Sequence, residues 1–176
     1  MSRPAGALLA AALIALSAAC GADTVKAQAW AKGVCGAVRP WAQQIQSSVA
    51  NVQAAVGTSK DPAVVKPQLS KLFGNAVRAT DTAIKGVERA GVPDVKDGKQ
   101  IAKDFRNALL SARNAFATAQ KSVQALPTGD KTRFSAAVVR IGAALSKDYG
   151  AAGKRIDQNR SAELKAAFEK EPACTR

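Results

Sequence analysis

The sequence predicts an all-α protein, an up-down-up-down four-helix bundle with a short extra C-terminal helix. Apolar residues recur every three or four positions over four long segments, a spacing that places them on one face of a helix. Short turns rich in glycine and proline separate these segments, and short connections join helices that are antiparallel neighbours. The chain of 176 residues is also long enough for one domain to bury a core without a metal or cofactor.

The first two predicted helices flank a short turn. Pro40 interrupts the apolar stripe of the first helix, and because proline has no backbone N–H we expect a kink or a restart of the helix there. In the turn, Asp61 is a suitable N-cap and Pro62 a suitable first residue for the second helix, which runs to about residue 90. The predicted inward positions of the two helices are Val34, Val38, Trp41, Ile45, Val49, Val52 and Val56, then Val65, Leu69, Leu72, Ala76, Ala83 and Val87, with Phe73 and Ile84 at the flank.

The third and fourth predicted helices have the most regular apolar spacing. The third ends at Pro127, and Asp130 is interpreted as the N-cap of the fourth. A short segment with Leu164 and Phe168 gives the extra C-terminal helix. The expected inward residues are Ile101, Phe105, Leu109, Ala112, Phe116, Ala119, Val123 and Leu126 on the third helix and Phe134, Val138, Ile141, Leu145, Tyr149, Ala152 and Ile156 on the fourth.

The N-terminus has the pattern of an export signal. Arg3 precedes a largely apolar run of roughly a dozen residues, too short for a helix that spans a bilayer but typical of a signal-peptide core. The small residues at 17–19 suit a signal peptidase. Cys20 follows them and resembles the lipobox cysteine of bacterial lipoproteins, with Ser17 at the position where that pattern usually has leucine.

The expected organisation is therefore a signal peptide at residues 1–19, a lipid-modified Cys20, an N-terminal tether at 20–29 and a single bundle domain at 30–176. Lipidation attaches two or three acyl chains, which suffice for stable membrane anchoring. Cleavage without lipidation, after Ala19 or Ala22, and an uncleaved signal anchor are the alternatives.

Three cysteines are an odd number in an exported chain, and lipidation of Cys20 accounts for one of them. Cys35 and Cys174 then remain as a pair in an oxidising compartment, where disulfides persist. With four antiparallel helices, the start of the first and the end of the fourth lie at the same end of the bundle, so these two residues can meet. Two buried free thiols or a metal site are the less favoured alternatives, because two cysteines without histidine fall short of the usual four zinc ligands.

Short motifs at both ends of the mature chain resemble those of small secreted proteins and lipoproteins of actinobacteria. This group has no assigned activity, so the resemblance implies an exported helical protein and transfers no functional residue. Trp41 lies on the apolar stripe and is expected to pack in the core, whereas Trp30 either packs or touches the membrane interface. The motifs are Trp30-Ala31-Lys32-Gly33-Val34-Cys35, Pro40-Trp41, and Leu164, Phe168 and Pro172-Ala173-Cys174 near the C-terminus.

We expect no catalytic residue, no metal site and no cofactor. The sequence has no histidine, which excludes Ser-His and Cys-His nucleophile systems and the Glu-x-x-His motifs of di-iron bundles in their usual forms. Residues 129–132 resemble a phosphate loop only superficially, since Asp130 separates the glycine from the lysine and no strand precedes them. Two carboxylate pairs, Asp81 with Glu88 and Asp97 with Asp104, are accompanied by lysines and are interpreted as surface charge pairing.

Basic residues recur every seven positions on the predicted helices, and seven residues are close to two helical turns, so each set forms a row. Two interpretations remain open: the rows solvate the outer faces, or they form a surface that binds a polyanion. The chain has 26 basic and 13 acidic residues, which favours anionic partners. The rows are Lys32 and Arg39 on the first helix, Lys71, Arg78 and Lys85 on the second, Lys99, Arg106 and Arg113 on the third, and Arg133, Arg140, Lys147 and Lys154 on the fourth.

The sequence thus predicts a non-catalytic, basic lipoprotein on the outer face of the cell membrane, a binding or envelope-associated protein rather than an enzyme. Anionic lipid and cell-wall polymer are the expected partners, besides the membrane that holds the lipid anchor. Nucleic acid is not an expected partner, because no aromatic residues alternate with the basic rows to stack on bases. The alternatives are a structural spacer or assembly partner of another envelope protein, and a freely secreted small protein.

Overall fold

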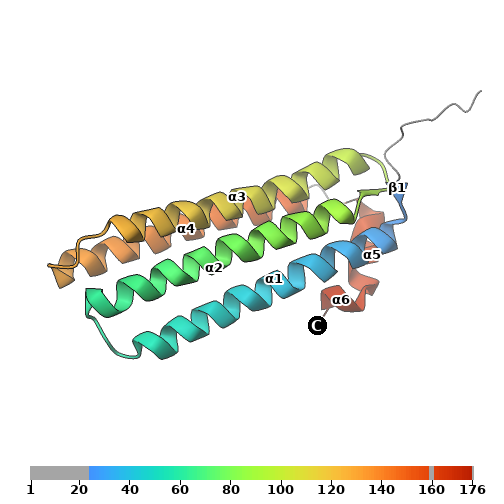
Figure 1. Cartoon of the computed structure of the whole chain (residues 1–176). Helices are drawn as coiled ribbons and strands as arrows, with labels where there is room; N and C mark the ends of the chain where they lie inside the picture. Colours follow the sequence, from blue (N-terminus) through green and yellow to red (C-terminus); the bar gives the residue numbers. More distant parts are fainter. Residues whose placement is uncertain (1–23, 159–160, 176) are drawn as a thin grey trace, which may run out of the picture.

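The computed structural model describes residues 24–158 and 161–175, without the side chains of 149–158 and Thr175. It shows an all-α bundle (Figure 1). The long helices are α1 (Ala27–Val56), α2 (Pro62–Arg89), α3 (Gly98–Ala125) and α4 (Lys131–Gln158), and two short helices follow, α5 (Ala162–Lys170) and α6 (Pro172–Thr175). The predicted signal peptide and Cys20 lie outside the described residues.

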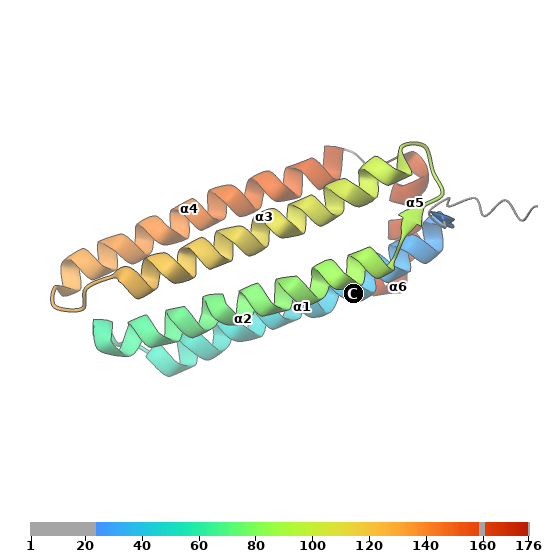
Figure 2. The ribbon, with the colours of Figure 1, turned by 45° about the horizontal axis from the view of Figure 1, so that its top comes forward.

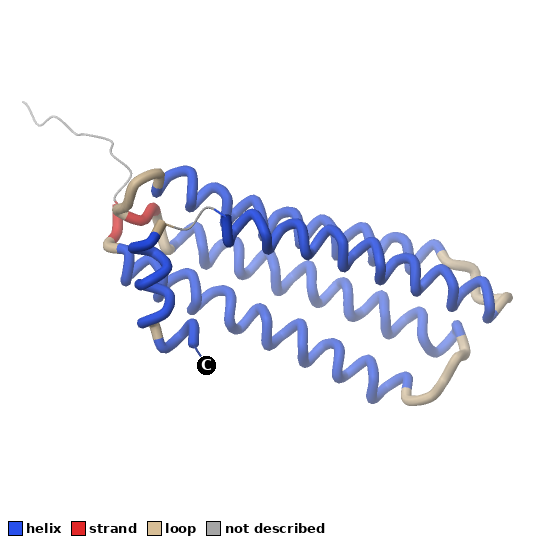
Figure 3. Tube along the Cα trace, turned by 180° about the vertical axis from the view of Figure 1, so that it is seen from behind, coloured by secondary structure: helices blue, strands red, loops and turns tan. Residues whose placement is uncertain are grey.

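The long helices pack in chain order, α1 on α2, α2 on α3 and α3 on α4. The view in Figure 2 shows them as two adjacent pairs. Helices α5 and α6 fold back across the base of the bundle and pack against α1 (Figure 3). Among the described residues, α1 and α4 have no comparable contact, so the bundle is closed at its base by the short helices rather than along its length.

The core confirms the expected face of α3 and modifies those of its neighbours. Seven of the eight predicted inward residues of α3 are buried, and Leu126 is half-buried. On α2, Phe73 and Ile84 are buried rather than at the flank, because this helix has a neighbour on each side and therefore buries a wide face. Among the α4 residues whose side chains are described, only Phe134 is buried, whereas Val138, Ile141 and Leu145 are half-buried. The side chains of Tyr149, Ala152, Lys154 and Ile156 lie outside the description.

The helix starts follow the sequence signals closely. The Asp61 carboxylate accepts a hydrogen bond from the backbone N–H of Ala63 at 3.0 Å, and Pro62 is the first residue of α2. Asp130 accepts a hydrogen bond from the backbone N–H of Arg133, so its interpretation as a helix cap is confirmed. Helix α1 does not restart at Pro40 but continues through it. Pro40 is exposed, so water can replace the backbone donor that proline lacks.

The base of the bundle begins earlier in the chain than the predicted domain start at residue 30. Strand β1 (Thr24–Val25) pairs in parallel with β2 (Val92–Pro93), which follows α2, and the backbone N–H of Asp94 donates to the Val25 carbonyl at 2.8 Å. Ala27 is already buried in α1. Residues 24–29 therefore contribute to the base through β1 and the first turn of α1.

Candidate functional site

The predicted pair of cysteines forms a disulfide at the base of the bundle. Cys35 of α1 and Cys174 of α6 are joined, with Cα atoms 5.2 Å apart and 139 residues between them in sequence. The bond links α6 to the first helix, and the antiparallel topology allows the two residues to meet there, as predicted. The base is thus covalently closed at the end where the described chain begins (Figure 1).

Trp30 is the centre of the packed base and does not reach the surface. Its exposed fraction is 0%, and its ring lies edge-on to Phe105 and Phe168 with centroids 5.1 and 5.8 Å away. The indole N–H donates to the Gly91 carbonyl at 3.0 Å. Of the two roles expected for Trp30, core packing is therefore the one observed, and this side chain is not available to a membrane surface.

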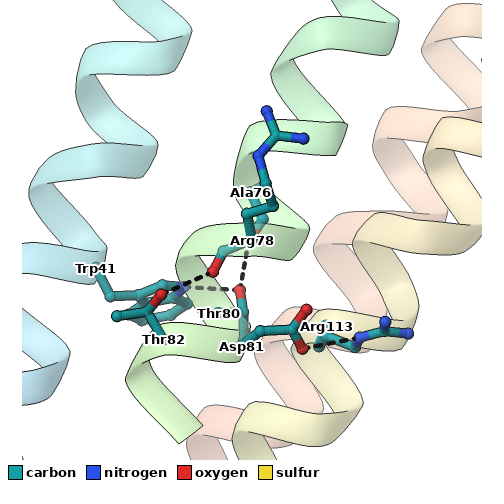
Figure 4. A network of polar contacts seen from close by, with 7 residues as sticks. All are labelled: Trp41, Ala76, Arg78, Thr80, Asp81, Thr82 and Arg113. Atoms are coloured by element: carbon teal, nitrogen blue, oxygen red, sulfur yellow. Dashed lines mark hydrogen bonds and ion pairs between the residues drawn. The ribbon is translucent and has the colours of Figure 1, made fainter. Parts of the chain in front are cut away.

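A second tryptophan links α1 to α2 in the middle of the bundle. The Trp41 indole N–H donates to the Thr80 hydroxyl at 2.9 Å, and that hydroxyl donates to the Ala76 carbonyl at 2.7 Å (Figure 4). The next residue, Asp81, points the other way and accepts from the Arg113 guanidinium of α3. Thr80 and Asp81, two consecutive residues of α2, thus connect this helix to α1 on one side and to α3 on the other.

Two of the three cations in the predicted α3 row are paired with acidic residues of α2. Arg106 Nε lies 2.6 Å from Glu88 Oε1, and Arg113 Nε lies 3.1 Å from Asp81 Oδ1. The seven-residue spacing of the two carboxylates thus matches that of the two arginines. Charge pairing of Asp81 and Glu88 was predicted, but the partners are these arginines of α3 and not the neighbouring Lys85. The third member of this row, Lys99, is exposed.

The rows on α4 and α2 keep more of their positive charge unpaired. On α4, Arg133 forms an exposed ion pair with Asp130, 3.3 Å from Nε to Oδ2, whereas Arg140 and Lys147 are exposed and form no ion pair with any described residue. On α2, Lys71, Arg78 and Lys85 are likewise exposed and without a carboxylate partner in the described part of the chain. Arg78 instead donates to the side-chain carbonyl of Asn75 at 2.5 Å.

Shallow hollows lie along two of the helix seams. A hollow of about 280 Å³ between α3 and α4 has four alanines in its lining, together with Arg140 and Asp148. Two adjacent hollows of about 190 and 270 Å³ lie between α1 and α2 and share Asn75. Polar side chains that the sequence interpretation did not select line this second seam: Gln44, Ser48, Asn51, Gln68, Asn75 and Thr82.

A signal for the α1–α2 seam exists in the sequence. Between Ala27 and Thr80 the chain contains six basic residues and a single acidic one, Asp61, and that carboxylate caps α2. This part of the hairpin has too few carboxylates to neutralise its own cations. The arrangement can therefore attract and hold anions, whereas the described residues contain no cluster of three or more histidine, cysteine, aspartate or glutamate side chains able to hold a metal ion.

The helices in the described ranges were also compared with the requirements of a membrane span, and none is both long and apolar enough to cross a bilayer. Comparison with known proteins gives no match to a protein-family model, to a curated protein or to a solved structure. A functional assignment therefore has to come from the geometry and charge of the chain itself.

Proposed function

We propose that this protein is a non-catalytic binding module, held at the outer face of the cell membrane by lipid on Cys20, that binds an anionic polymer or anionic lipid head groups. The observation that supports this most directly is a pair of exposed basic rows that form no ion pair with the described residues: Lys71, Arg78 and Lys85 on α2, and Arg140 and Lys147 on α4. Rows on rigid helices present cations at fixed intervals, which suits a repetitive anionic partner.

The charge balance strengthens this proposal. Basic residues outnumber acidic ones by two to one, 26 to 13, and part of the acidic set is already used by Arg106, Arg113 and Arg133. An excess of one sign raises the local concentration of oppositely charged partners. A single exposed ion pair contributes only about 0–1 kcal/mol, so the affinity has to come from many such contacts along a polymer or a lipid surface.

The proposed anchor is compatible with the orientation of the bundle. The described chain enters at the base, beside the disulfide and β1, while the α1–α2 and α3–α4 turns lie at the opposite end (Figure 1). A lipid on Cys20, only a few residues before Thr24, would hold the base close to the membrane. The long faces of α2 and α4 would then extend away from it.

Two measurements test the proposal. Mass spectrometry of the mature N-terminus should find Cys20 carrying acyl chains; an unmodified Cys20, or a start at Asp23, would disprove the anchor. Titration with polyphosphate at low and high salt should show binding that weakens steeply with salt, because exposed charges are screened within about 10 Å at 0.1 M salt. Neutral dextran is the control, and a failure to bind polyphosphate at low salt would exclude the polyanion role.

Apolar side chains on the surface favour a second candidate, a spacer or assembly partner of another envelope protein. Val139 on α4 is 71% exposed, and the neighbouring Ala136 and Ala143 are exposed as well. A protein partner that packs on this face would bury apolar area, so its binding would persist at high salt. Salt resistance of an isolated complex would therefore separate this function from the polyanion role.

A further inference from the structure

We propose that the seam between α1 and α2 is a binding site for a linear polymer of polyols or sugars joined by phosphodiester bonds. This site, called here the α1–α2 groove, has as its polar lining Gln44, Ser48 and Asn51 on α1 and Gln68, Lys71, Asn75, Arg78 and Thr82 on α2; Val52, Ala55, Leu72 and Ala79 complete the lining. The inference rests on the proposed polyanion binding and adds where the polymer binds and which chemical groups it carries.

The groove is a continuous recess rather than a flat basic face. One hollow of about 190 Å³ contains Lys71 and Asn75 in its lining, and the next, of about 270 Å³, contains Asn75 and Arg78. The shared Asn75 shows that the two hollows follow each other along the seam. Lys71 and Arg78 are seven residues apart on one helix, about 10 Å along its axis. The groove therefore offers two cationic positions on α2, with Asn75 between them.

Ser48 gives the groove an unpartnered polar group. It is only 3% exposed and lines the first hollow, yet its hydroxyl forms no hydrogen bond with any described residue. Every completely enclosed side-chain nitrogen or oxygen of the described residues does have a partner, so this hydroxyl is not fully enclosed, and it belongs to a residue that lines the hollow. A buried serine usually satisfies its hydroxyl within the protein. Here the hydroxyl is available to a ligand.

The remaining lining groups specify the ligand chemistry. Side-chain amides both donate and accept hydrogen bonds, which matches the hydroxyl groups of polyols and sugars. Lys71 and Arg78 match phosphate, and Arg78 is held in place by its hydrogen bond to Asn75. No carboxylate lines the groove to repel an anion. A ligand that alternates hydroxyl and phosphate groups satisfies both kinds of lining, whereas a polyanion without hydroxyls satisfies only the cations.

The position of the groove favours a polymer over lipid head groups. Ser48 lies about 30 Å along the helix axis from the start of α1 at the base. The base carries the predicted tether, so the groove lies toward the opposite end of the bundle (Figure 1). A linear chain can enter a recess between two helices, whereas head groups in a bilayer form a surface that contacts protruding side chains.

The test uses the protein as processed by the cell and poly(glycerol phosphate) of defined length, titrated calorimetrically at low salt. Lys71→Gln/Arg78→Gln removes two charges from the groove, and Lys103→Gln/Lys121→Gln removes two from exposed positions of α3 outside the basic rows as the matched control. We expect a loss of affinity of about tenfold or more for the groove variant, because charge-assisted hydrogen bonds are lost, and no more than about threefold for the control. All four positions are exposed, so both variants should fold.

The hydroxyl requirement is tested with Ser48→Ala and a second probe. This variant should bind poly(glycerol phosphate) severalfold more weakly and inorganic polyphosphate of equal phosphate number unchanged, since polyphosphate has no hydroxyls along its chain. Equal losses of affinity in the two charge variants would overturn the assignment of the binding site to the groove, while leaving the polyanion role intact. Displacement of the polymer by phosphatidylglycerol vesicles would reassign the site to head groups. Absence of binding to either polymer would overturn both proposals.

Discussion

At the scale of single residues, a few polar contacts determine how the helices are aligned. Thr80 is completely buried, and its hydroxyl accepts from Trp41 while donating to the backbone of its own helix. A buried polar group is tolerated only when it is hydrogen-bonded, and this one also fixes the rotation of α2 against α1. The same rotation turns Asp81 toward α3, where it meets Arg113.

Replacing Thr80 by valine should therefore destabilise the protein although the side chain keeps its shape. The substitution removes the acceptor of the buried Trp41 N–H, a loss of about 1–3 kcal/mol in the free energy of unfolding. Urea denaturation followed by tryptophan fluorescence measures this loss. The control is Thr82→Val, whose exposed hydroxyl donates only to the Arg78 carbonyl, and which should change stability by about 0.5 kcal/mol or less. Equal effects of the two substitutions would contradict the structural role of Thr80.

At the scale of elements, small residues bring α1 and α2 into close contact. A Cβ atom added at Gly86 of α2 would lie 2.5 Å from the Ala37 Cβ of α1, and one added at Gly33 would lie 2.8 Å from the Ala90 Cβ. Both distances are shorter than real carbon atoms permit. Glycine is thus required here by the neighbouring helix, not by the backbone conformation of its own helix.

Gly86→Ala and Gly36→Ala should consequently change stability in opposite directions. At Gly86 the added methyl group forces the helices apart and should destabilise by about 1–3 kcal/mol. At Gly36, where nothing lies within 4 Å of the added carbon, alanine should stabilise α1 by up to about 1 kcal/mol through its higher helix propensity. Chemical denaturation of both variants checks the two signs. A neutral Gly86→Ala protein would show that the two helices are not in close contact.

The elements also differ in how far the sequence could predict them. The predicted stripe of α3 is buried because this helix packs against both α2 and α4, and the same wide contact also buries Ala108 and Ala115 outside the stripe. The stripe of α4 is equally regular, yet Ile141 and Leu145 are only half-buried, since periodicity does not reveal how many neighbours a helix has. Sequence spacing also does not reveal how two packed helices are rotated about their axes. The pairing of Arg106 with Glu88 depends on that rotation and is therefore visible only in the structure. The α1–α2 groove was not predicted because its lining is shared between two elements, and only the scarcity of acidic residues indicated it.

At the scale of the whole molecule, closure is concentrated at the base. Helix α4 packs mainly on α3 in the described part of the chain, and α5, α6 and the disulfide take the place next to α1. Trp30, Phe105 and Phe168 come from three different helices and meet there. The short C-terminal helices therefore complete the core that the fourth long helix leaves open, and the covalent link between Cys35 and Cys174 holds them in position.

Loss of the disulfide should accordingly loosen the base and lower the melting temperature. The loop it closes is nearly the whole domain, for which the chain-entropy model gives roughly 4–5 kcal/mol as an upper value, or on the order of 10 °C in Tm. The variant Cys35→Ser/Cys174→Ser, which leaves no unpaired thiol at the base, is measured by calorimetry under non-reducing conditions. Reductant should lower the Tm of the native protein by a similar amount and leave the variant unchanged. In the variant, tryptophan emission should shift to longer wavelength at temperatures well below the main unfolding transition, because Trp30 becomes hydrated when α5 and α6 detach. A variant with the melting temperature and emission of the native protein would mean that packing alone closes the base.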